Sequence, residues 1–238
     1  MGDESFSFAE MQPLKQEIED EETRSQEKCE TETVMKKPET ADKETNTDTA
    51  VIPGWDKMPL SKERLTLDKT TCHKGLTVKK KGKEVSFDKG VFKHSISSES
   101  MVDVLCKEMF KSGCHYWEVI VLDVKKGPVP KLSWYVGVTS HEEKERKKES
   151  LTPENGYWVL QYERGKGFYV NTGLPTPVLV RDSFSTLGVY LDMYKKTLSF
   201  YDVDSKSHLY TFTEVKSENV LTPLFSPGDR CDHSLTLK

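Results

Sequence analysis

Residues 112–119 read SGCHYWEV, and the alternation in and after this stretch predicts a β-strand. Gly113 marks the turn at which the strand begins, because glycine tolerates backbone conformations that other residues avoid. Successive side chains of a strand point to opposite faces of its sheet. Two sets follow, with Trp117, Val119 and Val121 on one face and Tyr116, Glu118 and Ile120 on the other. The stretch also places Cys114 beside His115, so it raises the question of a metal or catalytic site.

The sequence predicts no metal site, no cofactor and no catalytic centre. Cys114-His115 and Cys72-His73 are adjacent pairs, so in a strand the two side chains of a pair would diverge. Zinc sites in proteins use ligands that are two to four residues apart. No GxSxG, P-loop or HExxH motif accompanies the six histidines. We therefore expect a protein that is not an enzyme.

The charge of the chain is divided between two unlike parts. Residues 1–50 carry a net charge of −9, whereas residues 51–238 carry +5, which together make the −4 of the whole chain. Between Glu19 and Ala50 the only large apolar residues are Val34 and Met35. Such a segment buries too little apolar surface to offset the entropy lost on ordering. We expect residues 1–50 to form a disordered acidic tail and residues 51–238 to form a folded domain.

Localisation signals are lacking in the sequence. No apolar run reaches the 18 or more residues of a membrane span. The first residues lack the basic start and apolar core of a secretory signal. The five cysteines are scattered, odd in number and without a CxxC pair, which favours a reducing compartment. We expect a cytoplasmic protein, with the nucleus as the alternative.

Two short motifs lie in the acidic tail. Residues 14–17, LKQE, resemble a SUMO acceptor in which Lys15 would be modified. Residues 43–47, KETNT, resemble the peptide that adds a strand to dynein light chain, although Asn46 stands in place of its glutamine. Patterns this short also arise by chance, so a purely solvated tail is the simpler reading of both.

From residue 51 onward, short apolar runs recur every 8–15 residues between turn-forming residues, a pattern typical of an all-β sandwich or barrel. The runs predict strands at Leu76–Val78, Glu84–Phe87, His115–Val124, Leu132–Thr139, Gly156–Tyr162, Phe168–Asn171, Thr186–Asp192, Thr197–Val203, His208–Phe212 and Leu235–Leu237. Hairpin turns are expected at 164–167, RGKG, and 193–196, MYKK. Only Ser98–Phe110 has a helical pattern, and no βαβ alternation predicts a parallel sheet.

These runs, in their order, resemble the PRY-SPRY (B30.2) domain. The matching blocks are LTLDKTTCHKGLTV at 65–78, SGCHYWEV at 112–119, WYVGVTS at 134–140, LTPENGYWVL at 151–160, LGVYLDMYKKTLSFYDV at 187–203 and TPLFSPG at 222–228. The resemblance implies a bent β-sandwich of two antiparallel sheets, with PRY at about 60–110 and SPRY at about 111–238. It also implies that Trp117 lies in the core of the sandwich.

Relatives with this domain include TRIM ubiquitin ligases, butyrophilins and fish immune receptors. The resemblance implies a non-enzymatic, monomeric module that binds a protein or peptide through loops at one end of the sandwich, in a setting such as innate immunity. One alternative is a substrate-recognition subunit of a ubiquitin ligase complex, and another is a decoy of full-length TRIM relatives. No RING pattern or coiled coil is present in this sequence.

The segment 157–163, YWVLQYE, indicates which face binds. One parity carries Trp158, Leu160 and Tyr162 and is predicted to be buried, whereas the other ends in Gln161 and Glu163. In the family member that binds antibody Fc, the positions that match Gln161 and Glu163 are tryptophans, and the position that matches Asp229 is a phenylalanine. This chain departs at all three positions, so the resemblance does not imply antibody binding.

Phosphoantigen sensing is likewise not implied, because residues 169–176, YVNTGLPT, contain no basic residue where butyrophilins hold a diphosphate. We predict a polar partner-binding rim made of His141, Glu142, Gln161, Glu163, Arg164, Asp229 and Arg230, flanked by Lys79–Lys83 and Lys125–Lys131. Taken singly, each of these residues is read more simply as an ordinary surface residue, because most loop residues carry no function. The basic runs at 79–83, KKKGK, and 144–148, KERKK, lie in predicted loops without interleaved aromatics, so we expect no nucleic-acid partner.

Overall fold

The structure is a computed structural model, and it describes residues 54–55, 61–88, 101–122, 133–141, 150–180, 183–216, 220–228 and 234–238. The predicted tail, with Lys15 and both of its short motifs, lies outside these residues. The boundaries proposed for the tail, PRY and SPRY stay predictions. No helix within the described ranges is long and apolar enough to cross a membrane.

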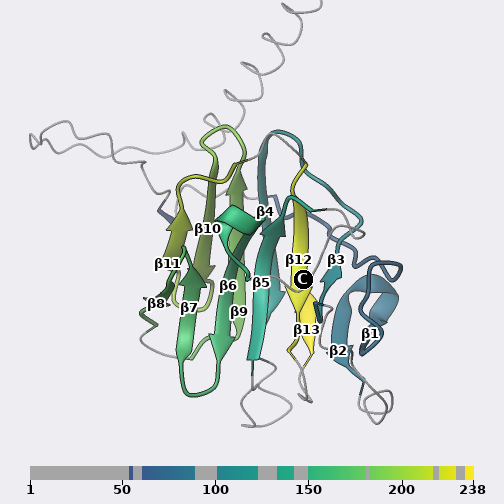
Figure 1. Ribbon diagram of the computed structural model, residues 1–238. Coiled ribbons are helices and arrows are strands. Elements are labelled where there is room, and N and C mark those ends of the chain that lie inside the picture. The colour runs from purple at the N-terminus through teal and green to yellow at the C-terminus, as the bar shows by residue number, and fades with distance from the viewer. Residues whose placement is uncertain are drawn as a thin grey trace, which may run out of the picture. The chain divides into compact units, whose positions relative to one another are not determined.

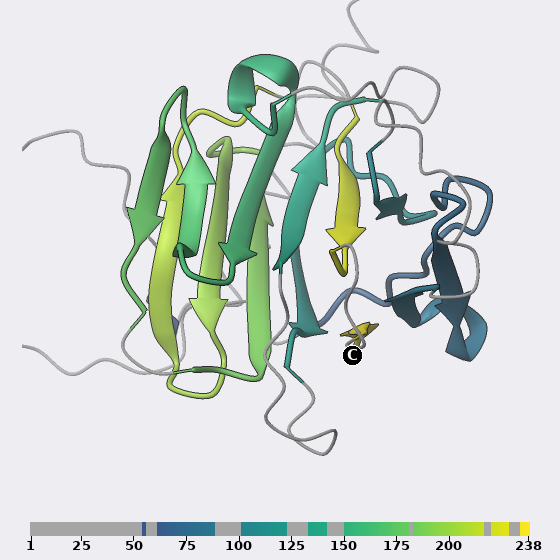
Figure 2. The same ribbon diagram turned by 60° about the horizontal axis from the view of Figure 1, so that its bottom comes forward.

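Two antiparallel sheets make up the fold (Figures 1 and 2). The seven-stranded sheet runs, in spatial order, β1 (Leu76–Lys79), β2 (Glu84–Phe87), β13 (Leu235–Leu237), β4 (Cys114–Ile120), β9 (Thr186–Asp192), β10 (Thr197–Asp202) and β11 (Ser207–Phe212). The six-stranded sheet runs β3 (Val104–Leu105), β12 (Thr222–Ser226), β5 (Ser133–Thr139), β6 (Tyr157–Glu163), β7 (Gly167–Asn171) and β8 (Pro175–Val178). The described residues also contain two 3-10 turns, η2 (Lys80–Gly82) and η6 (Pro153–Asn155). The predicted all-β antiparallel sandwich is confirmed.

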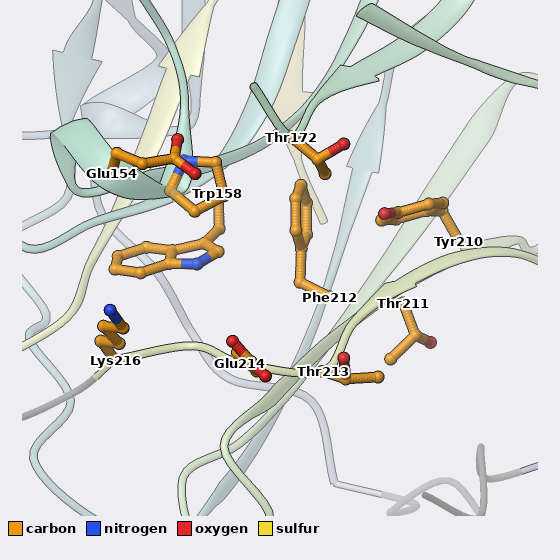
Figure 3. Close-up of a pocket in the computed structure, with 10 residues that line it drawn as sticks. Glu154, Trp158, Thr172, Tyr210, Thr211, Phe212, Thr213, Glu214 and Lys216 are labelled. Atoms are coloured by element: carbon orange, nitrogen blue, oxygen red, sulfur yellow. The ribbon is translucent and has the colours of Figure 1, made fainter. Parts of the chain in front are cut away.

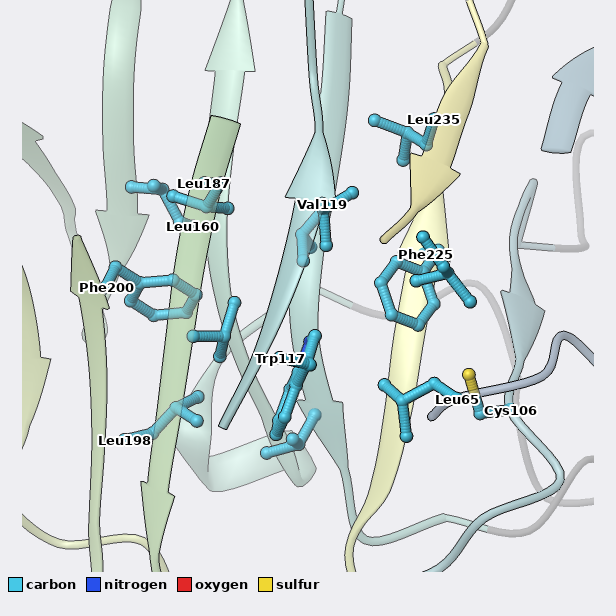
Figure 4. Packing of buried hydrophobic residues seen from close by; sticks show 14 of the residues in the cluster. Leu65, Cys106, Trp117, Val119, Leu160, Leu187, Leu198, Phe200, Phe225 and Leu235 are labelled. Atoms are coloured by element: carbon cyan, nitrogen blue, oxygen red, sulfur yellow. The ribbon is translucent and has the colours of Figure 1, made fainter. Parts of the chain in front are cut away.

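The core lies between the two sheets and is built from alternate residues of each strand. Trp117 is 1% exposed and belongs to the large apolar cluster together with Val119 from the same strand. Trp158 and Leu160 enter this cluster from β6, and Tyr162 packs against it. Figure 4 shows Trp117 among side chains that arrive from both sheets. The inward positions predicted for Trp117 and for this parity of β6 are therefore confirmed.

The helix expected at Ser98–Phe110 is wrong for the residues described there. Val104 and Leu105 form β3, which pairs with Phe225 and Leu224 of β12. The next amide, of Cys106, donates to the carbonyl of Pro223 at 3.0 Å, and Leu67 bridges Cys106 from the other side. Since neighbouring segments satisfy this backbone on both sides, sheet pairing replaces the local helical bonds that the apolar spacing suggested.

Four strands differ from the prediction. β4 ends at Ile120 rather than at Val124, and β3, β8 and β12 were not predicted as strands. β8 was not predicted because it contains Pro175 and Pro177, and proline usually argues against a strand. β8 is the last strand in the order of its sheet, where proline is tolerated. Both predicted hairpins, β6–β7 and β9–β10, are confirmed.

Candidate partner-binding face

The outer face of β6 is divided between a covered half and a polar half. Tyr157 and Val159 point away from the main core but are each only 1% exposed. They form a second apolar cluster with Leu105 of β3 and Leu224 of β12. Gln161 and Glu163 follow on the same face, because alternate residues share a side. The outer parity of β6 therefore becomes polar only toward the end of the strand.

Strand register brings two tyrosines beside these polar residues. Gln161 lies opposite Tyr135 of β5 on one side and opposite Tyr169 of β7 on the other. Directly opposed residues of antiparallel strands have Cβ atoms about 4.5–5.5 Å apart. We name the set Tyr135, Gln161, Glu163 and Tyr169 the outer-face strip. Both tyrosines are half-buried, and the hydroxyl of Tyr135 donates to Asp103 at 3.0 Å.

Two buried polar atoms on this face have no hydrogen-bond partner within the described part of the chain. The amide nitrogen of Gln161 is one, although the residue is only 7% exposed. The side-chain oxygen of Asn171 is the other, and Asn171 shares the face of Tyr169 in β7. Buried polar groups are nearly always paired, so this donor and this acceptor are unusual features of the face.

At the end of the strip nearest the β6–β7 turn, the charged residue is Glu163. Its carboxylate accepts from Lys166 Nζ at 2.8 Å and from the Tyr169 hydroxyl at 3.4 Å. The hydrogen bond to Glu163 raises the pKa of Lys166. Burial raises the pKa of Tyr169, and the nearby Glu163 carboxylate adds to this rise. At neutral pH the tyrosine is therefore a neutral hydroxyl, and the carboxylate is the charged group of the strip.

The turn after β12 approaches this same end of the sheet. Gly228 has φ +80°, and a Cβ there would lie 2.1 Å from the carbonyl oxygen of Ser133. Ser133 is the register partner of Glu163, so glycine lets the chain pass close to the strip. Asp229 and Arg230, which follow Gly228 in the sequence, lie outside the described residues. Arg164 is exposed in the β6–β7 turn next to Glu163.

His141 lies at the opposite end of the sheet from the strip. It follows β5, whose last residue Thr139 pairs with Tyr157, whereas Glu163 pairs with Ser133 at the other end. Six strand positions span about 20 Å. His141 Nε2 is 2.6 Å from the carbonyl oxygen of Asn155. Figure 1 shows η6 and the β6–β7 turn at opposite ends of the six-stranded sheet. The structure therefore brings together Gln161, Glu163 and Arg164 and separates them from His141.

The remaining predicted residues lie elsewhere or are not described. Glu142 and Lys125–Lys131 fall outside the described residues. Lys79–Lys83 spans the β1–β2 turn at the edge of the seven-stranded sheet, so it does not flank the strip. Lys80 pairs there with Glu84 at 2.5 Å, and Lys83 Nζ donates to the carbonyl oxygen of Leu65. Lys80 and Lys83 therefore bond near the β1–β2 turn rather than at the candidate site.

Tyr135 and Tyr169 were not predicted as site residues. Alternation in the sequence can assign each tyrosine to the outer face of its own strand. Only the strand register places the two tyrosines on either side of Gln161. Register across strands distant in sequence depends on tertiary pairing, which single-strand alternation does not specify. No three His, Cys, Asp or Glu side chains of the described residues form a group that could hold a metal ion.

Comparison with known proteins identifies similar chains. The family model described as SPRY domain matches residues 114–237. The erythroid membrane-associated protein of Mus musculus is 32% identical over 183 residues, which is 75% of this chain and 31% of that protein. Pyrin of Homo sapiens is 33% identical over 132 residues, or 56% of this chain and 16% of pyrin. The chain thus spans a third or less of the length of these two relatives.

A solved structure agrees with the architecture. The crystal structure of the TRIM65 PSpry domain superimposes with a TM-score of 0.56 at 23% identity, over 74% of this chain and 92% of that one. At this identity the likeness concerns the fold alone. It shows the same two-sheet sandwich that the register of the present strands describes.

Proposed function

We propose that this chain, which belongs to the SPRY domain family, recognises a protein or peptide partner through the outer-face strip. SPRY domains are protein-interaction modules found in immune-related proteins, and members of the family are generally non-catalytic. The resemblance of the sequence blocks to this family is confirmed for both the family and the fold. The choice of surface and the kind of partner are our proposals.

One observation carries the choice of surface, namely the unpaired amide nitrogen of Gln161 at 7% exposure. A buried donor without an acceptor costs stability, so a partner that supplies an acceptor regains the lost hydrogen bond. Tyr135 and Tyr169 flank this amide, and tyrosines are typical anchors of protein interfaces because they present a large apolar body with a polar tip.

The partner that suits the strip is a polar or basic segment. Glu163 places a carboxylate beside the tyrosines, and Lys166 neutralises it only from an exposed position. A partner lysine or arginine could therefore compete for Glu163, while a backbone carbonyl of the same segment accepts from Gln161. The similarity to pyrin and to the butyrophilin subfamily 1 member A1 of Homo sapiens supports an immune setting for such a partner.

Quantitative affinity capture with mass spectrometry tests the proposal. We expect Gln161→Ala/Glu163→Ala to deplete one or more captured proteins at least about tenfold, as the loss of central contacts does at interfaces. The control pair Lys74→Ala/Lys107→Ala removes two exposed side chains outside the strip and should leave the captured set unchanged. Equal capture by wild type and by both double variants, all with matching melting temperatures, would place the binding surface elsewhere.

A further inference from the structure

A pocket of about 250 Å³ opens between the two sheets, away from the outer-face strip. Trp158 forms one wall, and Phe212 and Tyr210 of β11 form another (Figure 3). η6 contributes Glu154, and the segment after β11 contributes Glu214 and Lys216. The volume is several times the roughly 30 Å³ that one water molecule occupies. It falls just below the range of about 300–1,000 Å³ typical of drug-sized ligands, so it suits a single side chain.

The indole nitrogen of Trp158 is a buried donor with no partner among the described residues. Trp158 is 2% exposed, and its Nε1 atom has no hydrogen bond. Figure 3 shows the nitrogen edge of the indole turned toward the side where Phe212 and Glu214 lie. An indole nitrogen only donates, so the group that completes this site has to present a hydrogen-bond acceptor.

The charged residues of the pocket further restrict which chemical group could bind there. Glu154, Glu214 and Lys216 are all exposed at the surface of the pocket, two carboxylates against one ammonium. A carboxylate ligand would accept from Trp158 but would meet two like charges. A guanidinium or ammonium ligand would pair with the carboxylates but has no acceptor for the indole. A primary carboxamide satisfies both, because its oxygen accepts from Trp158 while its NH₂ group donates to a carboxylate.

We propose that this pocket binds a primary carboxamide, such as the glutamine or asparagine side chain of a peptide. The aliphatic part of that side chain would pack between the Trp158 ring and Phe212, and its NH₂ group would donate to Glu214. This site is independent of the outer-face strip, because Trp158 points to the inner side of β6 whereas Gln161 and Glu163 point outward. Either site can therefore fail without the other.

Titration followed by NMR tests the pocket. The chain has four tryptophans, so the ¹⁵N-labelled protein gives four indole N–H signals that through-bond experiments can assign. N-acetyl-glutamine N-methylamide should move the Trp158 signal downfield and saturably in the millimolar range, because the indole gains an acceptor. N-acetyl-glutamate N-methylamide and N-acetyl-arginine N-methylamide share the same backbone, and each should bind at least about tenfold more weakly.

Trp117 is the matched internal control. Its indole nitrogen is also buried and unpaired, at 1% exposure, but Trp117 does not line the pocket. Its signal should stay in place throughout the titration. Movement of both signals together would indicate a general change in the core and would overturn the proposal.

Two variants separate this site from the strip. Glu214→Ala removes an exposed side chain, so the fold should persist, and it should weaken binding of the glutamine probe about tenfold. Glu163→Ala, in the strip, should leave this titration unchanged. A Trp158 signal that stays fixed at the solubility limit of the probe would overturn the proposal and indicate a pocket that holds water only. Equal shifts with the glutamine and glutamate probes, or no effect of Glu214→Ala, would also overturn it.

Discussion

The outer faces of the two sheets both carry tyrosines beside a buried polar side chain, but the two polar side chains differ in their hydrogen bonding. On the seven-stranded sheet, Tyr116, Tyr190 and Tyr201 form a buried cluster, and Tyr116 hydrogen-bonds the carboxylate of Glu118. That carboxylate accepts from the Tyr116 hydroxyl at 2.9 Å and pairs with Lys62 Nζ at 2.7 Å. On the six-stranded sheet, two tyrosines flank Gln161, whose amide nitrogen stays unpaired.

The difference lies in what covers each face. Residues before β1 contact the seven-stranded sheet: the Glu63 amide donates to the carbonyl oxygen of Tyr116, and Trp55 packs edge-on against Tyr201. The Glu118 cluster is held from within the chain, because Oε1 has two partners and Oε2, which has no hydrogen bond, lies 3.4 Å from Lys238 Nζ. The described residues supply no such partner to Gln161. The Glu118 carboxylate is therefore paired within the chain, whereas the Gln161 amide nitrogen has no partner among the described residues.

The largest expected effect comes from the core that supports both faces. Trp117→Ala should lower the free energy of unfolding by about 3–5 kcal/mol, because the cavity cannot refill in a close-packed interior. Trp117 stacks on Phe110 with ring centroids 5.9 Å apart, so the loss extends to that contact. Urea denaturation measures the change. A melting temperature close to that of the wild type would contradict the central position of this side chain.

A smaller loss of stability is expected on the outer face of the seven-stranded sheet. Glu118→Leu removes the carboxylate that Tyr116 and Lys62 share, and it leaves the buried tyrosine hydroxyl without its acceptor. The free energy of unfolding should fall by about 1–3 kcal/mol, the usual cost of a buried polar group left unpaired. Glu118→Gln retains an acceptor oxygen and should lose less. If Glu118→Leu is as stable as the wild type, this face is not held together by its polar cluster.

The same carboxylate predicts a dependence on pH. Burial alone would raise the pKa of Glu118, but hydrogen bonds from Lys62 and Tyr116 and the charges of Lys62 and Lys238 outweigh it, so the pKa is lowered from 4.5. A carboxyl whose pKa is lower in the folded state contributes stability above its unfolded pKa and loses it as pH falls through the folded pKa.

The stability difference between wild type and Glu118→Gln should therefore be constant from about pH 7 to about pH 5.5 and shrink below about pH 4.5. Urea denaturation of both proteins across this range measures it. A difference that grows on acidification would mean that the lysines do not stabilise the charged form of Glu118.

The sequence predicts the parts of this comparison unequally. Alternation in 112–121 and 157–163 was sufficient to orient Trp117 and Trp158, because a strand with one buried face has only one compatible parity. It could not predict that Tyr135 and Tyr169 flank Gln161, since that depends on the register of three strands. It also placed His141 in the same rim as Glu163, although the antiparallel order of β5 and β6 sets them at opposite ends. Local pattern determines which way a side chain points, and topology determines its neighbours.

The smallest effect on stability is expected on the outer face of the six-stranded sheet, and it discriminates best between the two faces. Gln161→Leu keeps a similar volume and removes a buried amide nitrogen that has no acceptor. The free energy of unfolding should stay unchanged or rise by up to about 1 kcal/mol, because no hydrogen bond is lost and a desolvation cost disappears. Thermal and urea denaturation measure this change, and capture of the partner should weaken in the same variant.

The opposite signs expected for Glu118→Leu and Gln161→Leu make the two faces a matched test. Both substitutions replace a buried polar side chain with leucine on an outer face, so differences in size and in helix or strand preference largely cancel. Destabilisation of Gln161→Leu by more than about 2 kcal/mol would show that its amide has a structural partner within this chain. The six-stranded face would then be closed like the other one, and the partner would have to bind elsewhere on the sandwich.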